Sequence, residues 1–457
     1  MTAGPSRSAR SPCTRACERG RTIEPRLEPE DAGRRETATR EAHRAIEAIW
    51  RIESARLIAG LARLVGDIGT AEELAQDALV AALEQWPTAG VPEKPGPWLM
   101  ATARHRATDL VRRRTTLDRK YEELGRGVAR DQGGADTATE DAFGDDLLGL
   151  MFMACHPILL TDARVALTLR VLGALTTEEI ARAFLVPVST IAQRIVRAKR
   201  TLVEAHVRFE LPAGPARAAR LASVLEVIYL IFNEGYSATE GEDWVRPALC
   251  EDAIRLGRIL AELVPNESEV HGLVALMEIH ASRLRARVGP SGEPILLLDQ
   301  DRATWDRLLI GRGLAALERA ERLGGAMGPY ALQAAIAACH ARATTPTATD
   351  WPRIVALYDA LAQLVPSPVV ELNRAVAVGM AFGPDAGLEL VDALVREHSL
   401  KAYHLLPAVR GDLLRKLGRL DEARAEFERA ALLTENARER ELLQRRAAEC
   451  TAERMSG

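Results

Sequence analysis

Residues 176–202 of this 457-residue chain have the sequence TTEEIARAFLVPVSTIAQRIVRAKRTL, which contains its clearest structural pattern. Thr176 followed by Glu179 predicts a capping box, in which the hydroxyl and the carboxylate satisfy backbone N–H groups at a helix start. Pro187 ends this first helix, because proline lacks an N–H and disfavours a helical residue before it. A second helix then begins near Ser189. The stretch therefore predicts two short helices joined by a tight turn.

The second helix of this pair is amphipathic, and its polar face is basic. Its apolar face has residues at helical spacing: Ile191, Ile195, Ala198 and Leu202. The opposite face carries the side chains that we expect to contact DNA: Ser189, Thr190, Gln193, Arg194, Arg197 and Arg200. A helix held by an apolar face, with a basic face in solvent, is what a major-groove recognition helix requires. An ordinary surface helix is the alternative, but the lack of any acid between Val188 and Val203 favours helix-turn-helix DNA binding.

The composition predicts an all-α protein. Ala, Leu, Arg and Glu dominate, only 4% of the residues are aromatic, and no convincing run of alternating β-branched residues is found. The formal net charge of -4 hides basic clusters at residues 104–114 and 194–200, so nucleic-acid binding stays open. No apolar run reaches the ~18 residues of a membrane span, and the Arg-rich start lacks the apolar core of a secretory signal. We therefore expect a cytoplasmic, nucleoid-associated protein that does not bind membranes.

No pattern in the chain indicates a catalytic site, a metal site or a cofactor. The six cysteines follow neither a disulfide framework nor a zinc-ligand spacing. Cys13 and Cys17 could bind a metal together, although an incidental pair is the simpler interpretation. We find no Ser/His/Asp order, no phosphate-binding glycine loop and no His-Glu-x-x-His pattern. The sequence therefore predicts a binding protein and no enzyme.

Changes in composition divide the chain into five segments. Residues 1–40 are rich in Arg, Pro, Ser, Gly and Glu and are predicted to be a disordered tail. Residues 42–114 form a helical unit, and residues 115–146 form a flexible acidic linker. Residues 147–208 hold the helix-turn-helix, and residues 216–457 form a helical extension. The predicted architecture is thus two small helical domains, a linker between them, and a long helical array.

The unit of residues 42–114 contains one acidic and one basic helix. The acidic surface, with the turn before it, comprises Asp67, Glu72, Glu73, Gln76 and Asp77. The basic helix presents Trp98, Arg104, His105, Arg106, Arg112 and Arg113. A solvated charged face would have the same pattern on either helix alone.

Three stretches in this order resemble extracytoplasmic-function (ECF) RNA polymerase sigma factors of the sigma-70 family. They are DIGTAEELAQDALVAALEQW, WLMATARHRATDLVRRR and the stretch of residues 176–202. The resemblance implies that the first binds the clamp of the largest subunit of core polymerase. It implies that the second melts and reads the −10 promoter element as separated strands, and that the third reads the −35 element as double-stranded DNA. His105 departs from the pattern, because the class more often has Asn there.

Five later stretches resemble the group of these sigma factors that carries a C-terminal extension of tetratricopeptide (TPR) type. They are CHPILLTDARVALTLR, YLIFNEGYSATEG, GPYALQAAIAACHA, SPVVELNRAVAV and YHLLPAVRGDLLRKLGR. Ala154, before Cys155 and His156, departs from the group, which often has a second Cys there. Three similar helices of the extension have Tyr358, Val391 and Phe427 at matching places, with spacings of 33 and 36 residues. These spacings bracket the tetratricopeptide period of about 34 residues, and such helix pairs stack into a solenoid.

The segment IFNEGYSATEG, residues 231–241, is unusual for such an array. Asn233, Glu234 and Tyr236 could line a ligand or partner site. The alternative is a capped turn in which Asn233 and Glu234 accept hydrogen bonds from backbone amides.

The leading hypothesis is a sigma factor that directs core polymerase to promoters, with an extension that contacts the sigma domains and regulates them in cis. One alternative is a helix-turn-helix regulator with a TPR-type interaction domain that is not a polymerase subunit. A TPR adaptor that binds neither DNA nor polymerase is a third hypothesis, which the basic helices disfavour.

Overall fold

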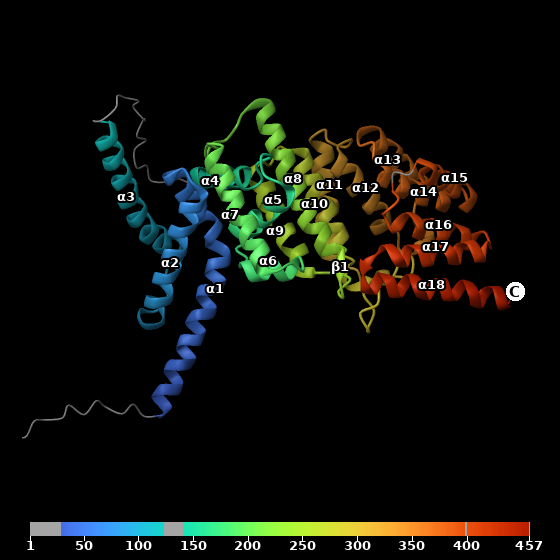
Figure 1. The fold of residues 1–457 in the computed structure, drawn as a ribbon, viewed down its shortest axis with the longest axis horizontal. Helices are drawn as coiled ribbons and strands as arrows, with labels where there is room; N and C mark the ends of the chain where they lie inside the picture. The colour runs from blue at the N-terminus through green and yellow to red at the C-terminus, as the bar shows by residue number, and fades with distance from the viewer. Residues whose placement is uncertain (1–28, 123–139, 398–399, 457) are drawn as a thin grey trace, which may run out of the picture.

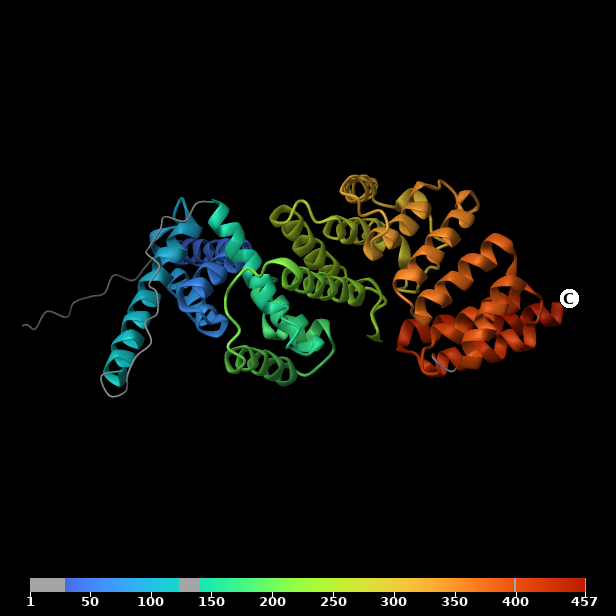
Figure 2. The same ribbon diagram turned by 90° about the horizontal axis from the view of Figure 1, so that it is seen from above.

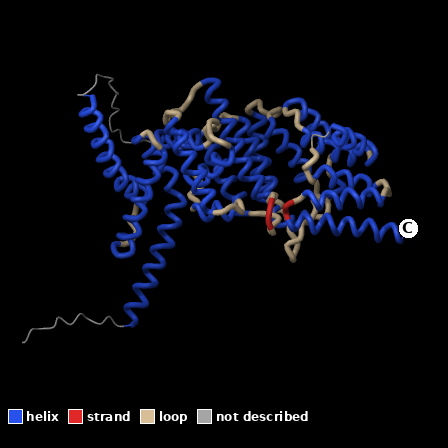
Figure 3. Tube along the Cα trace, in the orientation of Figure 1, coloured by secondary structure: helices blue, strands red, loops and turns tan. Residues whose placement is uncertain are grey.

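The computed structural model describes residues 29–122, 140–397 and 400–456, and nearly all of them are helical (Figures 1 and 3). The N-terminal unit contains α1 (Pro29–Val65), α2 (Ile68–Ala89) and α3 (Pro95–Glu122). The helix-turn-helix unit contains α4 (Glu140–Ala154), α5 (Thr161–Val171), α6 (Thr177–Ala183) and α7 (Val188–Glu204). The predicted all-α class is confirmed.

The extension contains the remaining elements. Its first half consists of α8 (Gly214–Tyr236), β1 (Glu240–Gly241), α9 (Pro247–Leu263), α10 (Ser268–Ala281), the 3-10 turns η1 (Leu284–Arg287) and η2 (Arg302–Thr304), α11 (Arg307–Arg322) and α12 (Pro329–Arg342). Its second half consists of η3 (Pro346–Ala348), α13 (Trp351–Leu364), α14 (Pro368–Phe382), α15 (Pro384–Glu397), α16 (Leu405–Lys416), α17 (Leu420–Leu433), β2 (Glu435–Asn436) and α18 (Ala437–Ser456). Seen from above, these helices form an arc that leads away from the N-terminal unit (Figure 2).

Two predicted segment boundaries differ from the structure. Helix α1 begins at Pro29, so residues 29–40 are helical although we expected them in the tail. These residues are rich in Glu, Ala and Arg, which favour helix, and they continue directly into an amphipathic helix. Helices α3 and α4 likewise take up both ends of the predicted linker of residues 115–146. The predictions for residues 1–28 and 123–139 lie outside the described residues.

Helix α4 belongs to the packed structure because it lies against α1. Asp146 is buried, and its Oδ1 lies 3.1 Å from Nε of Arg63 in α1. Burial raises the pKa of Asp146, since the charged carboxylate is taken out of water. This contact joins the helix-turn-helix unit to the N-terminal unit.

One hydrophobic core runs through both N-terminal units and into the extension. It includes Leu61 of α1, Leu150 of α4, Leu167 of α5 and Ile228 of α8, all of them buried. Helices α8 and α9 thus bury apolar surface together with the helix-turn-helix unit. The start of the extension is therefore part of the same packed body.

The second half of the extension is built from helical hairpins. Helices α13, α15 and α17 begin 33 and 36 residues apart, and each packs against its neighbours in the chain. A Cβ on Gly411 of α16 would lie 2.9 Å from the ring of Phe427 in α17, so only glycine permits this close approach. The prediction of a helical-repeat region is confirmed.

A short parallel strand pair, which the sequence pattern does not reveal, connects the two ends of the extension. Glu240 and Gly241 of β1 pair with Glu435 and Asn436 of β2. Asn436 is fully buried, and its Nδ2 donates to the carbonyls of Ala238 (3.1 Å) and Asp243 (2.9 Å). The loop after α8 is therefore held by the last repeat. Among the described residues, no helix is both long enough and apolar enough to cross a bilayer.

Candidate nucleic-acid interface

The helix-turn-helix forms as its sequence predicts. Thr176 Oγ1 accepts from the N–H of Glu179 at 3.1 Å, and the Glu179 carboxylate accepts from the N–H of Thr176 at 2.8 Å. Leu185 in the turn has a φ of 50°, which reverses the chain before Pro187 starts the next helix. The four predicted apolar residues of α7 are all buried: Ile191, Ile195, Ala198 and Leu202.

The opposite face of α7 points to solvent. Ser189, Gln193, Arg197 and Arg200 are exposed, and Thr190 and Arg194 are half-buried. Arg194 lies 2.9 Å from Asp162 of α5, and Arg200 lies 3.1 Å from Glu204 one turn later. Arg197 has no ion pair or hydrogen bond within the described part of the chain. It is therefore the arginine of this face whose guanidinium is already free to bind an anion or a base edge.

The basic face of α3 is also exposed. Arg104, His105, Arg106 and Arg112 lie at the surface. Arg106 pairs with Asp77 of α2 at 2.8 Å, and His105 lies 3.7 Å from Asp109. The side chain of Arg113 lies outside the described residues.

Trp98 at the start of α3 has a packing role as well as a partly accessible ring. Its ring meets that of the buried Trp86 edge-on, with 5.2 Å between centroids. The contact stabilises the packing of α2 against α3, because edge-to-face aromatic pairs are favourable. Only part of Trp98 remains available to a base.

The predicted acidic surface of α2 is only partly at the surface. Glu73 and Asp77 are exposed, whereas Asp67 caps the helix by accepting from the N–H groups of Gly69 and Thr70 at 3.2 and 2.8 Å. Glu72 is 4% exposed, so the expectation that it lies on the outer face is wrong for this arrangement. Gln76, half-buried, donates to Glu72 at 2.8 Å.

Two basic side chains of the helix-turn-helix unit cover Glu72. Nε of Arg170 in α5 donates to its Oε1 at 2.6 Å, and Nζ of Lys199 in α7 lies 2.5 Å from its Oε2. Burial by itself would raise the pKa of Glu72, but Lys199 and Arg170 together outweigh it and hold the pKa below its usual value. Glu72 is therefore a charged group that joins the two units.

The extension contacts the helix-turn-helix at its turn. Nη1 of Arg246 donates to the carbonyl of Ala183 at 2.6 Å, and it also pairs with Glu234. A Cβ on Gly241 of β1 would overlap Leu185. Neither the spacing nor the composition of the sequence singles out Arg246.

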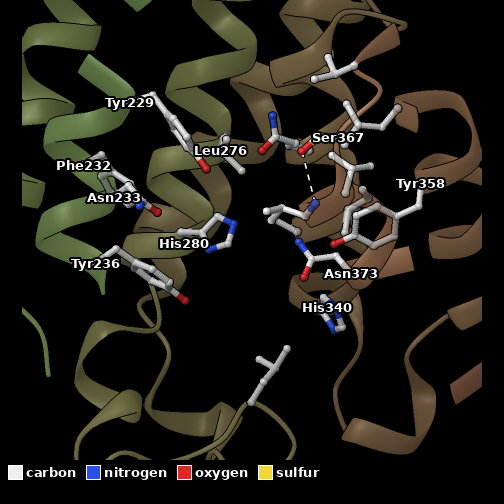
Figure 4. A pocket seen from close by; sticks show the side chains of 18 of the residues that line it. Tyr229, Phe232, Asn233, Tyr236, Leu276, His280, His340, Tyr358, Ser367 and Asn373 are labelled. Carbon is white, nitrogen blue, oxygen red and sulfur yellow. Dashed lines mark hydrogen bonds between the residues drawn. The ribbon is translucent and has the colours of Figure 1, made fainter. Parts of the chain in front are cut away.

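The segment IFNEGYSATEG divides between two roles. Asn233 and Tyr236 line a cavity in the extension (Figure 4), whereas Glu234 faces Arg246 and accepts from Thr239 Oγ1 at 3.0 Å. Gly235 is required because a Cβ there would lie 2.8 Å from the backbone nitrogen of Cys250. Asn233 and Tyr236 therefore line one cavity, whereas Glu234 stabilises the fold through its ion pair with Arg246.

The cysteines of the described residues are free and buried: Cys155, Cys250, Cys339 and Cys450. Burial raises the pKa of Cys155 to about 12, which keeps its thiol protonated and unreactive. Within those residues, no three His, Cys, Asp or Glu side chains gather as a metal site. Cys13 and Cys17 lie outside the described residues.

Family comparisons match all three parts of the chain. The family model of sigma-70 region 2 matches residues 52–116, and that of sigma-70 region 4 matches residues 150–202. Residues 220–321 match a family of unknown function, DUF6596.

Two individual proteins are also similar. An uncharacterized protein of Rhizobium meliloti (strain 1021) is 45% identical over 381 residues, which cover 83% of this chain and 89% of the relative. The crystal structure of yeast Tom70 covers 93% of this chain and 87% of its own at 11% identity, but its TM-score of 0.30 supports no conclusion.

Regions 2 and 4 follow one another along the chain, and the helical extension comes after them. The chain therefore belongs to the sigma-70 family, as an ECF-type sigma factor with a C-terminal helical extension.

Proposed function

We propose that this sigma factor reads promoters through α7 and α3, and that its extension acts in cis as structural support for region 4. Sigma-70 proteins bind core RNA polymerase and promoter DNA and initiate transcription; they are not enzymes. The observation that carries the proposal is the outward basic face of α7, with Arg197 exposed and unpaired in the described structure.

Promoter contacts are assigned to two helices. Ser189, Gln193 and Arg197 would enter the major groove of the −35 element, where arginine can bind guanine in bidentate geometry. Arg104, His105 and Arg106 of α3 would bind the −10 region. The arginines would contact its phosphates, and the bases of the separated strands would lie against the same surface. Working at the chromosome, the protein would act in the cytoplasm, in the nucleoid.

Polymerase binding is assigned to α2, whose exposed Glu73 and Asp77 would meet the clamp of the largest subunit. Glu72 can join them only if Arg170 and Lys199 release it. We infer that the two sigma units separate when polymerase binds. Glu72 would then exchange its ion pairs with Arg170 and Lys199 for ion pairs with the polymerase clamp.

Three arginines connect the extension to the helix-turn-helix unit, and these contacts support the proposed role of the extension. Arg164 of α5 donates to Ser223 Oγ at 2.7 Å and to Glu226 at 2.8 Å, both on α8. Arg255 of α9 donates to the carbonyls of Leu172 (3.4 Å) and Gly173 (3.2 Å). With Arg246 at the turn, these bonds connect the extension to α5, to the residues that follow it and to α6.

Run-off transcription tests the proposal. Core polymerase with the full chain, on promoter fragments from its own genome, should initiate at defined sites that core polymerase alone does not use. Binding to operator DNA without co-purification of core polymerase would instead indicate an independent helix-turn-helix regulator.

A further inference from the structure

A cavity of about 490 Å³ lies in the extension, where its first half meets its second (Figure 4). Helices α8, α10, α12, α13 and α14 all contribute to its wall. Its volume is in the range of small-molecule sites in proteins. In Figure 4 the Tyr229 hydroxyl and the ring of His280 face this space from one side, and Tyr358 and Asn373 lie on the other.

The wall combines a large apolar surface with a few polar groups. Tyr229, Phe232, Leu276, Ile336 and Tyr358 supply aromatic and aliphatic surface. No Asp or Glu is among the described residues that line it, whereas an arginine, Arg283, is. The cavity is thus suited to a ligand with an apolar body and without positive charge.

Arg283 is 7% exposed and has no carboxylate partner in the described structure. Its Nη2 donates to Tyr236 Oη at 2.7 Å and to His280 Nδ1 at 2.8 Å. Because an arginine only donates, His280 Nδ1 accepts, and the neutral ring carries its hydrogen on Nε2. The wall therefore presents a guanidinium and an adjacent ring N–H donor.

The surroundings of Arg283 add positive charge and no compensating negative charge. Burial, and then the charges of Arg283 and Arg287, lower the pKa of His280; burial with Arg283 and Arg302 lowers that of His340 to about 3. Both histidines are therefore neutral. Arg302 donates to the carbonyls of His340 (2.9 Å) and Ala343 (2.8 Å), and no described carboxylate pairs with it. A buried cation without a counter-ion is costly, and an anion bound beside it would remove that cost.

We propose that this cavity binds a small organic anion, with a carboxylate or phosphate group held by Arg283 and His280. The apolar body of the ligand lies against Tyr229, Leu276 and Tyr358. This site is separate from promoter and polymerase recognition, so its existence does not depend on the function proposed above.

The position of the cavity also gives its ligand a route to the helix-turn-helix. Asn233 and Tyr236 on α8 line the cavity, and Glu234 between them pairs with Arg246, whose Nη1 donates to Ala183 in the helix-turn-helix. A ligand that shifts the end of α8 would change this contact. That consequence, unlike the binding itself, rests on the proposed sigma function.

Isothermal titration calorimetry of the full-length chain tests the site. The probes are 4-phenylbutyrate and phenyl phosphate, with the neutral alcohol 4-phenylbutanol as the matched comparison. We expect saturable one-to-one binding of at least one acid, and binding of the alcohol at least tenfold weaker, because a charged hydrogen bond is lost. No binding of either acid at millimolar concentration, or equal affinity for acid and alcohol, would overturn the proposal.

Three variants locate the binding. Arg283→Gln should abolish the preference for acid over alcohol. Arg285→Gln changes an exposed arginine of η1 that does not line the cavity, and it should leave the preference unchanged. Asn373→Trp changes an exposed residue of the wall and should exclude both acids from the cavity without affecting the core. Should Arg283→Gln fail to fold, Asn373→Trp decides: unchanged acid affinity in that variant overturns the site, and loss of affinity supports it.

Discussion

Glu72 of α2 and Lys199 of α7 form an ion pair, with 2.5 Å between Oε2 and Nζ. One residue lies on the helix assigned to polymerase binding and the other on the helix assigned to DNA binding. The pair therefore joins the two helices on their buried sides. Arg170 adds a second cation to the same carboxylate.

Replacing Glu72 by Gln should destabilise the chain by about 3 kcal/mol, because two half-buried cations lose their charged partner. The free energy of unfolding by urea measures this. Glu73→Gln is the matched control, since Glu73 is the exposed neighbour on the same helix, and it should change stability little. Equal stability of the two variants would mean that the ion pair does not hold the units together.

The contribution of Glu72 should depend on pH in a defined direction. Its pKa is lowered in the folded chain, so its stabilisation is present above the unfolded pKa of about 4.3 and is lost as pH falls through the folded value. The difference in unfolding free energy between the native chain and Glu72→Gln should therefore be constant near neutral pH and shrink in acid. A difference that grows on acidification would contradict the assignment.

Replacing Arg197 by Ala should weaken promoter binding by about 1–3 kcal/mol and relax specificity at one position of the −35 element. Fluorescence anisotropy with a matched set of promoter duplexes measures both effects. Arg312→Ala is the control, because Arg312 is also an exposed arginine and lies on α11 in the extension. If both variants bind like the native chain, Arg197 does not read a base.

Replacing Arg246 by Met should loosen the helix-turn-helix turn, because the carbonyl of Ala183 and the carboxylate of Glu234 both lose their donor. Hydrogen exchange of the amides at residues 181–187 should become faster. The control is Arg374→Met, which breaks a comparable pair with Glu371 and Asp359 inside the extension. If hydrogen exchange at residues 181–187 has the same rate in both variants, Arg246 does not stabilise the turn.

Truncation after Pro212 should abolish initiation and yield a chain without a cooperative thermal transition. This cut removes α8 and α9, whose buried Ile228 and Leu256 share the core of the helix-turn-helix unit. A chain ending at Arg342 keeps that shared core and should retain exchange protection in region 4. Normal transcription by the chain that ends at Pro212 would show that region 4 functions without the extension.

Local geometry explains which parts of the fold and the site could be predicted. Capping by Thr176, the break at Pro187 and the buried face of α7 depend on residues within a few positions of one another. The exposure of Arg197 follows from the same helical period. Boundaries were less accurate, as at Pro29, because helix propensity continues through residues that resemble a tail in composition.

Contacts between distant residues could not be predicted in the same way. A lone arginine such as Arg246 or Arg283 has no spacing that marks its partner. The cavity is built from five helices, and its unpaired charge is visible only once their side chains are placed. The unusual composition of residues 231–241 indicates Asn233 and Tyr236 as lining residues of a site. The same composition also indicates Glu234, which instead pairs with Arg246.

Most of the helices, the apolar face of α7 and the family follow from the amino-acid sequence, because they depend on short-range order along the chain. The burial of Glu72, the core that the extension shares with region 4 and the position of Arg283 at a cavity follow from the packing of distant helices. These depend on which surfaces meet, and burial of apolar area selects among many helix arrangements that the same local pattern permits.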